Sequence, residues 1–139
     1  MPTDLEVSFP ATTSGMVAAL ETIEHSGLAW NLGPDQIGRL RIIVEELFSN
    51  TIKYGYGREC DYPVRLRLEM APVLTLTYED DAAPFDPTLW KPAEAMETPD
   101  QRPEGQAGIK MVLGLSVTAI YRPRAGGNCL VITLASPSL

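Results

Sequence analysis

The spacing of apolar residues in the first part of the chain predicts a strand followed by a helix. Residues 5–9 alternate apolar and polar side chains, as in a strand with one buried face, and Pro10 is expected to end it. A helix should then run from a threonine or serine cap at 12–14 to about Gly27. Its core-facing residues, by their spacing, are Met16, Val17, Leu20 and Ile23.

A second helix is predicted from Pro34 to about Tyr54. Proline suits a first helical position, and Asp35 in the first turn is favourable to the helix dipole. Gly55 supplies the expected stop. The apolar residues at helical spacing are Ile37, Leu40, Ile43, Val44 and Leu47.

The rest of the chain predicts two hairpins with an irregular segment and a helix between them. Residues 64–70 and 73–78 alternate cleanly and are joined by a short turn, so they form an antiparallel hairpin. An irregular stretch from 80 to 105 follows, and a loop of that length usually serves as a lid or a binding loop. A helix over 108–115 precedes a final hairpin of residues 116–121 and 128–134.

This order of elements predicts an α+β fold. Helices and strands in this sequence suit a two-layer α/β sandwich, with helices on one face of a mixed, largely antiparallel sheet. The 139 residues are one domain's worth, so we expect a single domain over residues 1–139. Hydrophobic residues at 45% and charged residues at 21% exclude a disordered tail, a collagen-like fibre and a coiled coil.

Charge and cysteine content narrow the expected partners and compartment. Eleven basic and eighteen acidic residues give a net charge of −7, which argues against nucleic-acid binding and against docking on anionic membranes. The sequence contains no apolar run long enough to span a bilayer and no signal-peptide pattern at its start, so we expect a cytoplasmic protein. Cys60 and Cys129 are therefore expected to be free thiols.

Candidate chemistry begins on the second helix. Glu46 and Asn50 are four residues apart and so share one face, while Val44 and Leu47 point toward the core. A carboxylate beside a carboxamide can hold Mg²⁺ and a bound water, because Mg²⁺ prefers oxygen ligands. The alternative is that the two residues simply belong to the polar face of an amphipathic helix.

Two further segments carry weaker signals. Asp80 and Asp81 end a strand and precede small residues, where a carboxylate can accept a hydrogen bond from an exocyclic amine and a flat ring can approach the backbone. Gly105 and Gly108 open a helix, and the free N–H groups there can face a phosphate. Taken alone, the first could be an ordinary acidic turn and the second a flexible hinge.

Together, in this order and spacing, the three segments resemble the GHKL ATPase superfamily, which includes gyrase, the histidine kinases and a heat-shock chaperone. Residues 46–55 resemble its N box, 80–86 its first glycine box and 105–112 its second. Closer still, the chain resembles the bacterial anti-sigma factor serine/threonine kinases of the partner-switching type. That resemblance covers nearly the whole chain, to Leu134, and includes Gly126-Gly127-Asn128 in the last hairpin.

The resemblance implies a Bergerat ATP-binding fold, ATP and Mg²⁺ as cofactors, and specific roles for matched residues. Glu46 would be the general base, Asn50 would coordinate Mg²⁺, and Asp80 would bind the adenine amino group. Residues 88–104 would form the ATP lid. Gly105 and Gly108 would cradle the phosphates, and the other matched motif positions assigned to the nucleotide site are Lys53, Ala82, Phe85 and Ile109.

The same resemblance implies partners. A STAS-type anti-anti-sigma protein would be the phosphoryl acceptor, a sigma factor would be sequestered, and the chain would form a homodimer. Two departures from the family pattern, Ala82 and Gln106 in place of glycines, favour an alternative. In that alternative the same fold binds a partner or a nucleotide without phosphoryl transfer, whereas the presence of Glu46 favours the kinase.

Overall fold

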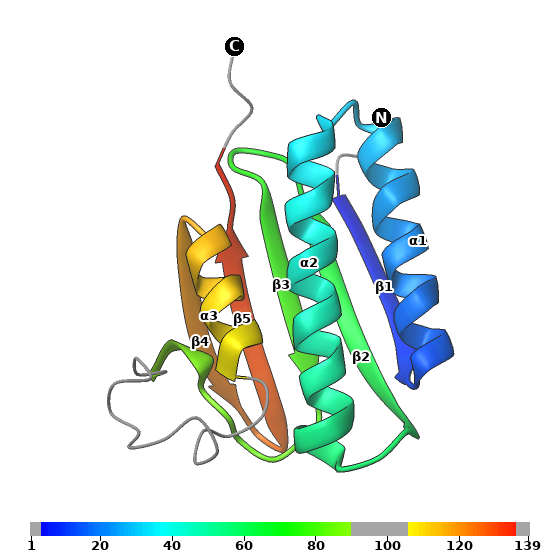
Figure 1. The fold of residues 1–139 in the computed structure, drawn as a ribbon, viewed down its shortest axis with the longest axis vertical. Coiled ribbons are helices and arrows are strands. Elements are labelled where there is room, and N and C mark those ends of the chain that lie inside the picture. The colour runs from blue at the N-terminus through cyan, green and yellow to red at the C-terminus, as the bar shows by residue number, and fades with distance from the viewer. Residues whose placement is uncertain (1–3, 90–105, 136–139) are drawn as a thin grey trace.

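The computed structural model describes residues 4–89 and 106–135 (Figure 1). The described elements follow the predicted order of strand, helix, helix, two strands, helix and two strands. They are β1 (Asp4–Ala11), α1 (Thr13–Ala29), α2 (Pro34–Asn50), the π-helical turn η1 (Thr51–Tyr56), β2 (Cys60–Glu69), β3 (Thr75–Asp80), the 3₁₀ turn η2 (Pro87–Leu89), α3 (Gln106–Leu115), β4 (Thr118–Arg124) and β5 (Gly127–Thr133).

The strands form one five-stranded sheet in the order β1-β2-β3-β5-β4, and each neighbouring pair is antiparallel. The three α-helices lie against one face of this sheet, with α2 between α1 and α3 (Figure 1). The predicted α+β two-layer sandwich with helices on one face is therefore confirmed, but the described sheet is wholly antiparallel and not mixed. Among the described residues, no helix is long and apolar enough to cross a membrane.

The core lies between the helices and the sheet. Alternation in β2 and β3 turns Val64, Leu66, Leu76 and Tyr78 toward the helices, and each is buried. They meet the apolar side of α2, where Phe48 is fully buried. Burying each such side chain contributes roughly 1.5–3 kcal/mol. Asp80 is the last residue of β3 whose side chain faces the helices, so a buried carboxylate follows Leu76 and Tyr78 on this face.

The predicted core face of α1 was wrong at one position. Val17 is 47% exposed, whereas Ala19 and Gly27 are buried. At Gly27 the two helices approach closely, since a Cβ there would lie 2.7 Å from Cγ1 of Ile37. Small residues therefore bring α1 against α2, which an apolar periodicity does not reveal.

Several predicted boundaries were also inexact, and β2 begins four residues earlier than predicted, at Cys60. Pro10 lies within β1 rather than ending it, and its partner in the register is Pro63, which also has no N–H to donate. The second α-helix ends at Asn50, and the chain continues as η1. The left-handed residue that ends this segment is Gly57, with φ of +77°, and not Gly55. The two cysteines are free thiols, as predicted.

Candidate functional site

The three segments singled out in the sequence meet beside the end of α2. The Glu46 carboxylate touches Gly108 so closely that a Cβ on that glycine would overlap it. Gly55 lies against Ala82, since a Cβ at Gly55 would be 2.8 Å from that of Ala82. The structure thus places segment 46–55 in contact with both of the glycine-box segments.

Glu46 and Asn50 lie one turn apart on α2, and Glu46 contacts the start of α3. Both side chains are half-buried, whereas Glu45 is exposed and Val44 and Leu47 are buried. Their spacing of four residues, one helical turn, is as predicted. Within residues 4–89 and 106–135, no group of three or more His, Cys, Asp or Glu side chains could hold a metal ion. Mg²⁺ commonly binds through one or two side chains together with waters and substrate phosphates, so it does not require such a group.

Asp80 is the best-defined polar group of the site. It is only 5% exposed, at the end of β3. The Thr51 hydroxyl donates to its Oδ2 at 2.7 Å, the Asn128 amide donates to Oδ1 at 2.8 Å, and the Ala82 N–H donates to Oδ1 at 3.2 Å. One carboxylate thus binds three elements, which are the loop after β3, the start of η1 and β5.

These contacts leave Asp80 with room for one more donor. An ionised carboxylate has about four acceptor positions and no donor. Among the described residues Oδ1 has two partners and Oδ2 has one, so the remaining position is on Oδ2. A group that binds there must carry an N–H or O–H, which an exocyclic amine does.

A hydrogen-bonded chain connects Asp80 to the backbone of α2. The Thr51 and Tyr78 hydroxyl oxygens are 2.6 Å apart, and the Tyr78 hydroxyl also lies 3.1 Å from the Leu47 carbonyl oxygen, to which it can donate. Because Thr51 gives its single hydrogen to Asp80, Tyr78 is the donor in the bond between the hydroxyls, and its one hydrogen is shared between Thr51 and the Leu47 carbonyl. Burial raises the pKa of Tyr78 well above its usual value, so this hydroxyl stays a donor at neutral pH.

We expect replacement of Thr51 by valine to destabilise the protein by about 1–3 kcal/mol, because two buried groups lose a partner. Thr51→Ser keeps the hydroxyl and should lose no more than about 1 kcal/mol, the value of a buried methyl group. Urea denaturation of the two variants measures the difference. Equal stability of both would mean that the hydroxyl is not part of this network.

A second group of side chains fixes the backbone at the end of β3. The Asp81 N–H donates to the Tyr56 hydroxyl at 2.8 Å. The Asp81 carboxylate accepts from Arg65 at 2.7 Å and from Arg124 at 2.8 Å, and these hydrogen bonds lower its pKa. Arg124 also donates to the Asp80 carbonyl oxygen at 2.9 Å. Asp81 is thus held by structural contacts, while Asp80 faces inward.

Tyr56 should make stability pH-dependent at high pH. Burial, with the nearby charges of Asp80 and Asp81, raises its pKa from 10.0 to about 12, against the lowering effect of its backbone hydrogen bond. A folded-state pKa above the unfolded value gives stabilisation that is complete below pH 10.0 and lost as the pH rises through about 12. The difference in unfolding free energy between wild type and Tyr56→Phe should therefore narrow across that window. Urea denaturation at several pH values tests this, and a constant difference would contradict it.

The remaining predicted site residues differ in exposure. Ala82 is buried, and because Asn31 is the one described non-glycine residue with a positive φ, alanine fits the backbone at 82 without strain. Ile109 is buried, Lys53 is exposed in η1, and the Phe85 ring is 58% exposed. Gly105 and residues 90–104 of the predicted lid lie outside the described residues.

Sequence reasoning did not assign roles to Thr51, Tyr78 or Asn128. The alternation of β3 contained a signal for Tyr78, which has the same parity as Asp80 and therefore faces the same side. Thr51 follows Leu47 by four residues and so continues the buried side of α2. The role of Asn128 depends on the register between β3 and β5, which leaves no local signal in the amino-acid pattern.

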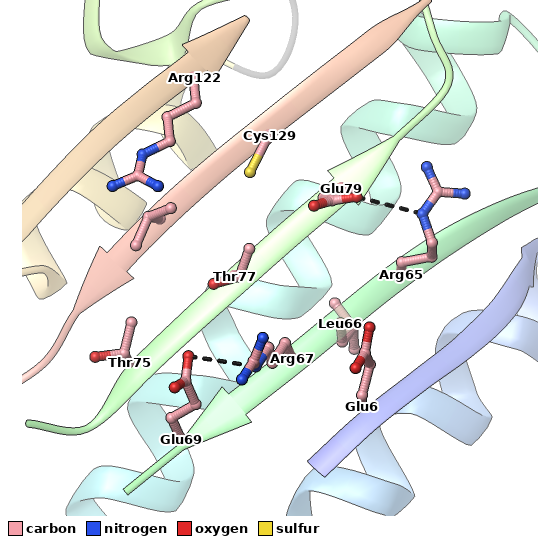
Figure 2. A pocket seen from close by; sticks show the side chains of 11 residues that line it. Glu6, Arg65, Leu66, Arg67, Glu69, Thr75, Thr77, Glu79, Arg122 and Cys129 are labelled. Atoms are coloured by element: carbon pink, nitrogen blue, oxygen red, sulfur yellow. Dashed lines mark hydrogen bonds and ion pairs between the residues drawn. The ribbon is translucent and has the colours of Figure 1, made fainter. Parts of the chain in front are cut away.

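A separate hollow of about 410 Å³ lies on the sheet face opposite the helices. Figure 2 shows its charged side chains, with Arg65 paired to Glu79 and Arg67 to Glu69. None of the described residues predicted for the site lines it. Glu6 and Arg122 also line this hollow, so side chains of both charges are present on this face.

Comparison with known proteins identifies the family of this chain. The histidine kinase-like ATPase domain family matches residues 9–134. The chain belongs to this family. No curated protein matches the chain.

Solved structures resemble this histidine kinase-like ATPase domain in fold. The crystal structure of the RsbU and RsbW domains of Rv1364c from Mycobacterium tuberculosis matches 99% of this chain with a TM-score of 0.66 and 16% identity. The chain spans 34% of that chain's length. The histidine kinase domain of a blue-light activated histidine kinase, EL346, from Erythrobacter litoralis matches 96% of this chain and 68% of its own, with a TM-score of 0.48 and 14% identity.

Proposed function

We propose that this protein is an ATP- and Mg²⁺-dependent protein serine/threonine kinase that acts as an anti-sigma factor. It would phosphorylate a STAS-type antagonist and sequester a sigma factor, so that phosphorylation decides which partner it holds. The observation that carries the proposal is the direct contact of the Glu46 carboxylate with Gly108. That contact brings a candidate base to the segment where a phosphate would bind.

The residues present fit a nucleotide. The open acceptor position on Asp80 suits the adenine amino group, which is a donor. The backbone at the start of α3, including Gly108, would bind phosphate oxygens, because first-turn N–H groups have no partner within their helix. Asn50 would hold Mg²⁺ through its side-chain oxygen. When bound, Mg²⁺ neutralises charge on the triphosphate.

The proposed chemistry assigns one proton-transfer step to Glu46. Its carboxylate would accept the hydroxyl proton of the substrate serine or threonine as that oxygen forms its bond to the γ-phosphorus, and ADP would leave. Asn50 and Gly108 would keep the reacting groups in line, which is the main contribution of a protein to phosphoryl transfer. Lys53, exposed beside Asn50, would add positive charge near the phosphates.

A binding module without catalysis is the second candidate. It is favoured by Gln106, which is the first residue of α3 and replaces a glycine of the expected motif. The expected motif has no side chain at this position, which leaves the backbone open to phosphates. Ala82, the second departure from the family pattern, does not favour the binding module, because alanine fits the backbone there without strain.

The proposed partners follow from the same assignment. We expect a cytoplasmic homodimer that binds a sigma factor and a STAS-domain protein. The net charge of −7 supports protein partners in preference to nucleic acid or an anionic membrane. The fold likeness to the RsbU and RsbW domain structure is compatible with this proposal.

Transfer of γ-phosphate labelled from ATP to purified STAS-domain proteins tests the proposal. The kinase account expects label on a serine or threonine of one of them, dependent on Mg²⁺. Phosphate release to water without any labelled acceptor would support a plain ATPase instead. Formation of a stable complex without transfer would support the binding module.

A further inference from the structure

We propose that Asn128 is a positioning residue that fixes both the Asp80 carboxylate and the loop after β3 for nucleotide recognition. The inference rests on the proposed ATP site but adds a residue that does not itself touch the nucleotide. It follows from the hydrogen bonds of one side chain, from the strand register and from the close approach of β5 to β3.

The Asn128 amide uses all of its hydrogen-bonding capacity within the protein. A carboxamide has two N–H donors and an oxygen with two acceptor positions. Asn128 is 9% exposed. Its Nδ2 donates toward Asp80 Oδ1 (2.8 Å), the Ala83 carbonyl (3.0 Å) and the Ala82 carbonyl (3.3 Å), and its Oδ1 accepts from the Tyr121 hydroxyl (2.6 Å) and the Phe85 N–H (2.8 Å).

These partners also determine which way the amide faces. The Phe85 N–H can only donate and the Ala83 carbonyl can only accept, so exchanging the amide oxygen and nitrogen would break both bonds. With every position occupied, Asn128 has none left for a ligand. Any effect on nucleotide binding must therefore act through Asp80 and the loop.

The strand register brings the amide to this place. Asn128 lies directly opposite Asp80 in the β3–β5 pair, so the two side chains share a face. The preceding residue is Gly127, and a Cβ there would overlap the Asp80 carbonyl oxygen. Arg124 holds the same carbonyl at 2.9 Å. The final hairpin thus makes hydrogen bonds to Asp80 from the Asn128 side chain and from the Arg124 guanidinium.

This arrangement determines which Asp80 oxygen is open. Asn128 and the Ala82 N–H fill Oδ1, while Oδ2 keeps a free acceptor position beside Thr51. Without the amide, Oδ1 would lose its 2.8 Å donor, and only Thr51 and the Ala82 N–H would hold the carboxylate. We therefore expect Asn128 to strengthen the binding of a purine amino group by keeping Oδ2 in place.

Asn128→Asp is the most direct test. This variant keeps the size and the acceptor oxygen but replaces the donor by a second carboxylate oxygen near Asp80 Oδ1. We expect ATP affinity to fall at least roughly tenfold at neutral pH. It should recover toward about pH 5.5, because two adjacent carboxylates share a proton and so restore a donor.

Asn31→Asp is the matched control. It makes the same charge change at an exposed residue with φ of 61°, a conformation that aspartate also adopts. We expect it to bind ATP as wild type does at every pH. An Asn128→Asp variant that also matches wild type at every pH would overturn the inference.

Asn128→Ser covers the case in which the aspartate variant does not fold. The smaller side chain removes the donor without adding charge. We expect folded Asn128→Ser to bind ATP at least roughly tenfold more weakly. Lower stability with unchanged ATP affinity would mean a merely structural role and overturn the inference. No ATP binding by wild type would overturn the proposed function, whereas normal binding by these variants overturns only the role of Asn128.

Discussion

Replacing Glu46 by glutamine should reduce phosphoryl transfer to a serine or threonine acceptor by roughly 10²–10⁴-fold. Glutamine keeps the size and polarity of the side chain but cannot take up the hydroxyl proton. ATP affinity should stay close to wild type, because the proposed base acts on the acceptor rather than on the nucleotide. Initial rates with labelled ATP and a STAS-domain acceptor, beside calorimetric ATP titration, measure both quantities.

Glu45→Gln is the control for this experiment. It makes the same chemical change at the adjacent position, where the side chain is exposed. We expect Glu45→Gln to retain wild-type transfer. Equal rates for the two variants, whether both high or both low, would remove Glu46 from the mechanism.

Asp80→Asn should have the second large effect, on binding rather than on transfer. The amide keeps one oxygen for the Asn128 donor, but its new NH₂ group would face the ligand in place of an acceptor. A lost hydrogen bond to a charged group contributes about 1.5–3 kcal/mol, which corresponds to a roughly 10- to 100-fold fall in ATP affinity. Calorimetric titration with ATP in the presence of Mg²⁺ measures it.

Asp81→Asn is the matched control for Asp80. Asp81 is the next residue, but its carboxylate is on the surface and is held by Arg65 and Arg124. We expect this variant to keep its ATP affinity. If Asp81→Asn weakened ATP binding as much as Asp80→Asn, the assignment of Asp80 as the base-recognising residue would be wrong.

The order of the elements was predictable from the sequence because it depends on local periodicity. The alternation over residues 64–70 and the helical spacing after Pro34 each reflect one buried face, and both appear in the structure. The placement of Glu46 and Asn50 on one face of α2 was predictable for the same reason, since residues four apart share a helix face. Boundaries were less accurate, because the change from α2 to η1 leaves no signal in the apolar pattern.

The inner contacts of the site were not predictable in this way. Asp80 and Asn128 are 48 positions apart, and only the β3–β5 register brings them together. The contact of Glu46 with Gly108 likewise depends on how α3 packs beside α2. We expected these segments to form one site because of the family resemblance. Their actual contacts are determined by packing between segments that are distant in the sequence.

We propose that the end of α2, the Asp80 loop and the start of α3 form one ATP site. Calorimetric titration of the wild-type protein and Asn50→Ala with ATP and Mg²⁺ tests this most directly. We expect saturable binding by wild type, at ATP concentrations of roughly millimolar or below, and binding at least roughly tenfold weaker in the variant. Absence of saturable binding by wild type, or equal binding by both proteins, would contradict it.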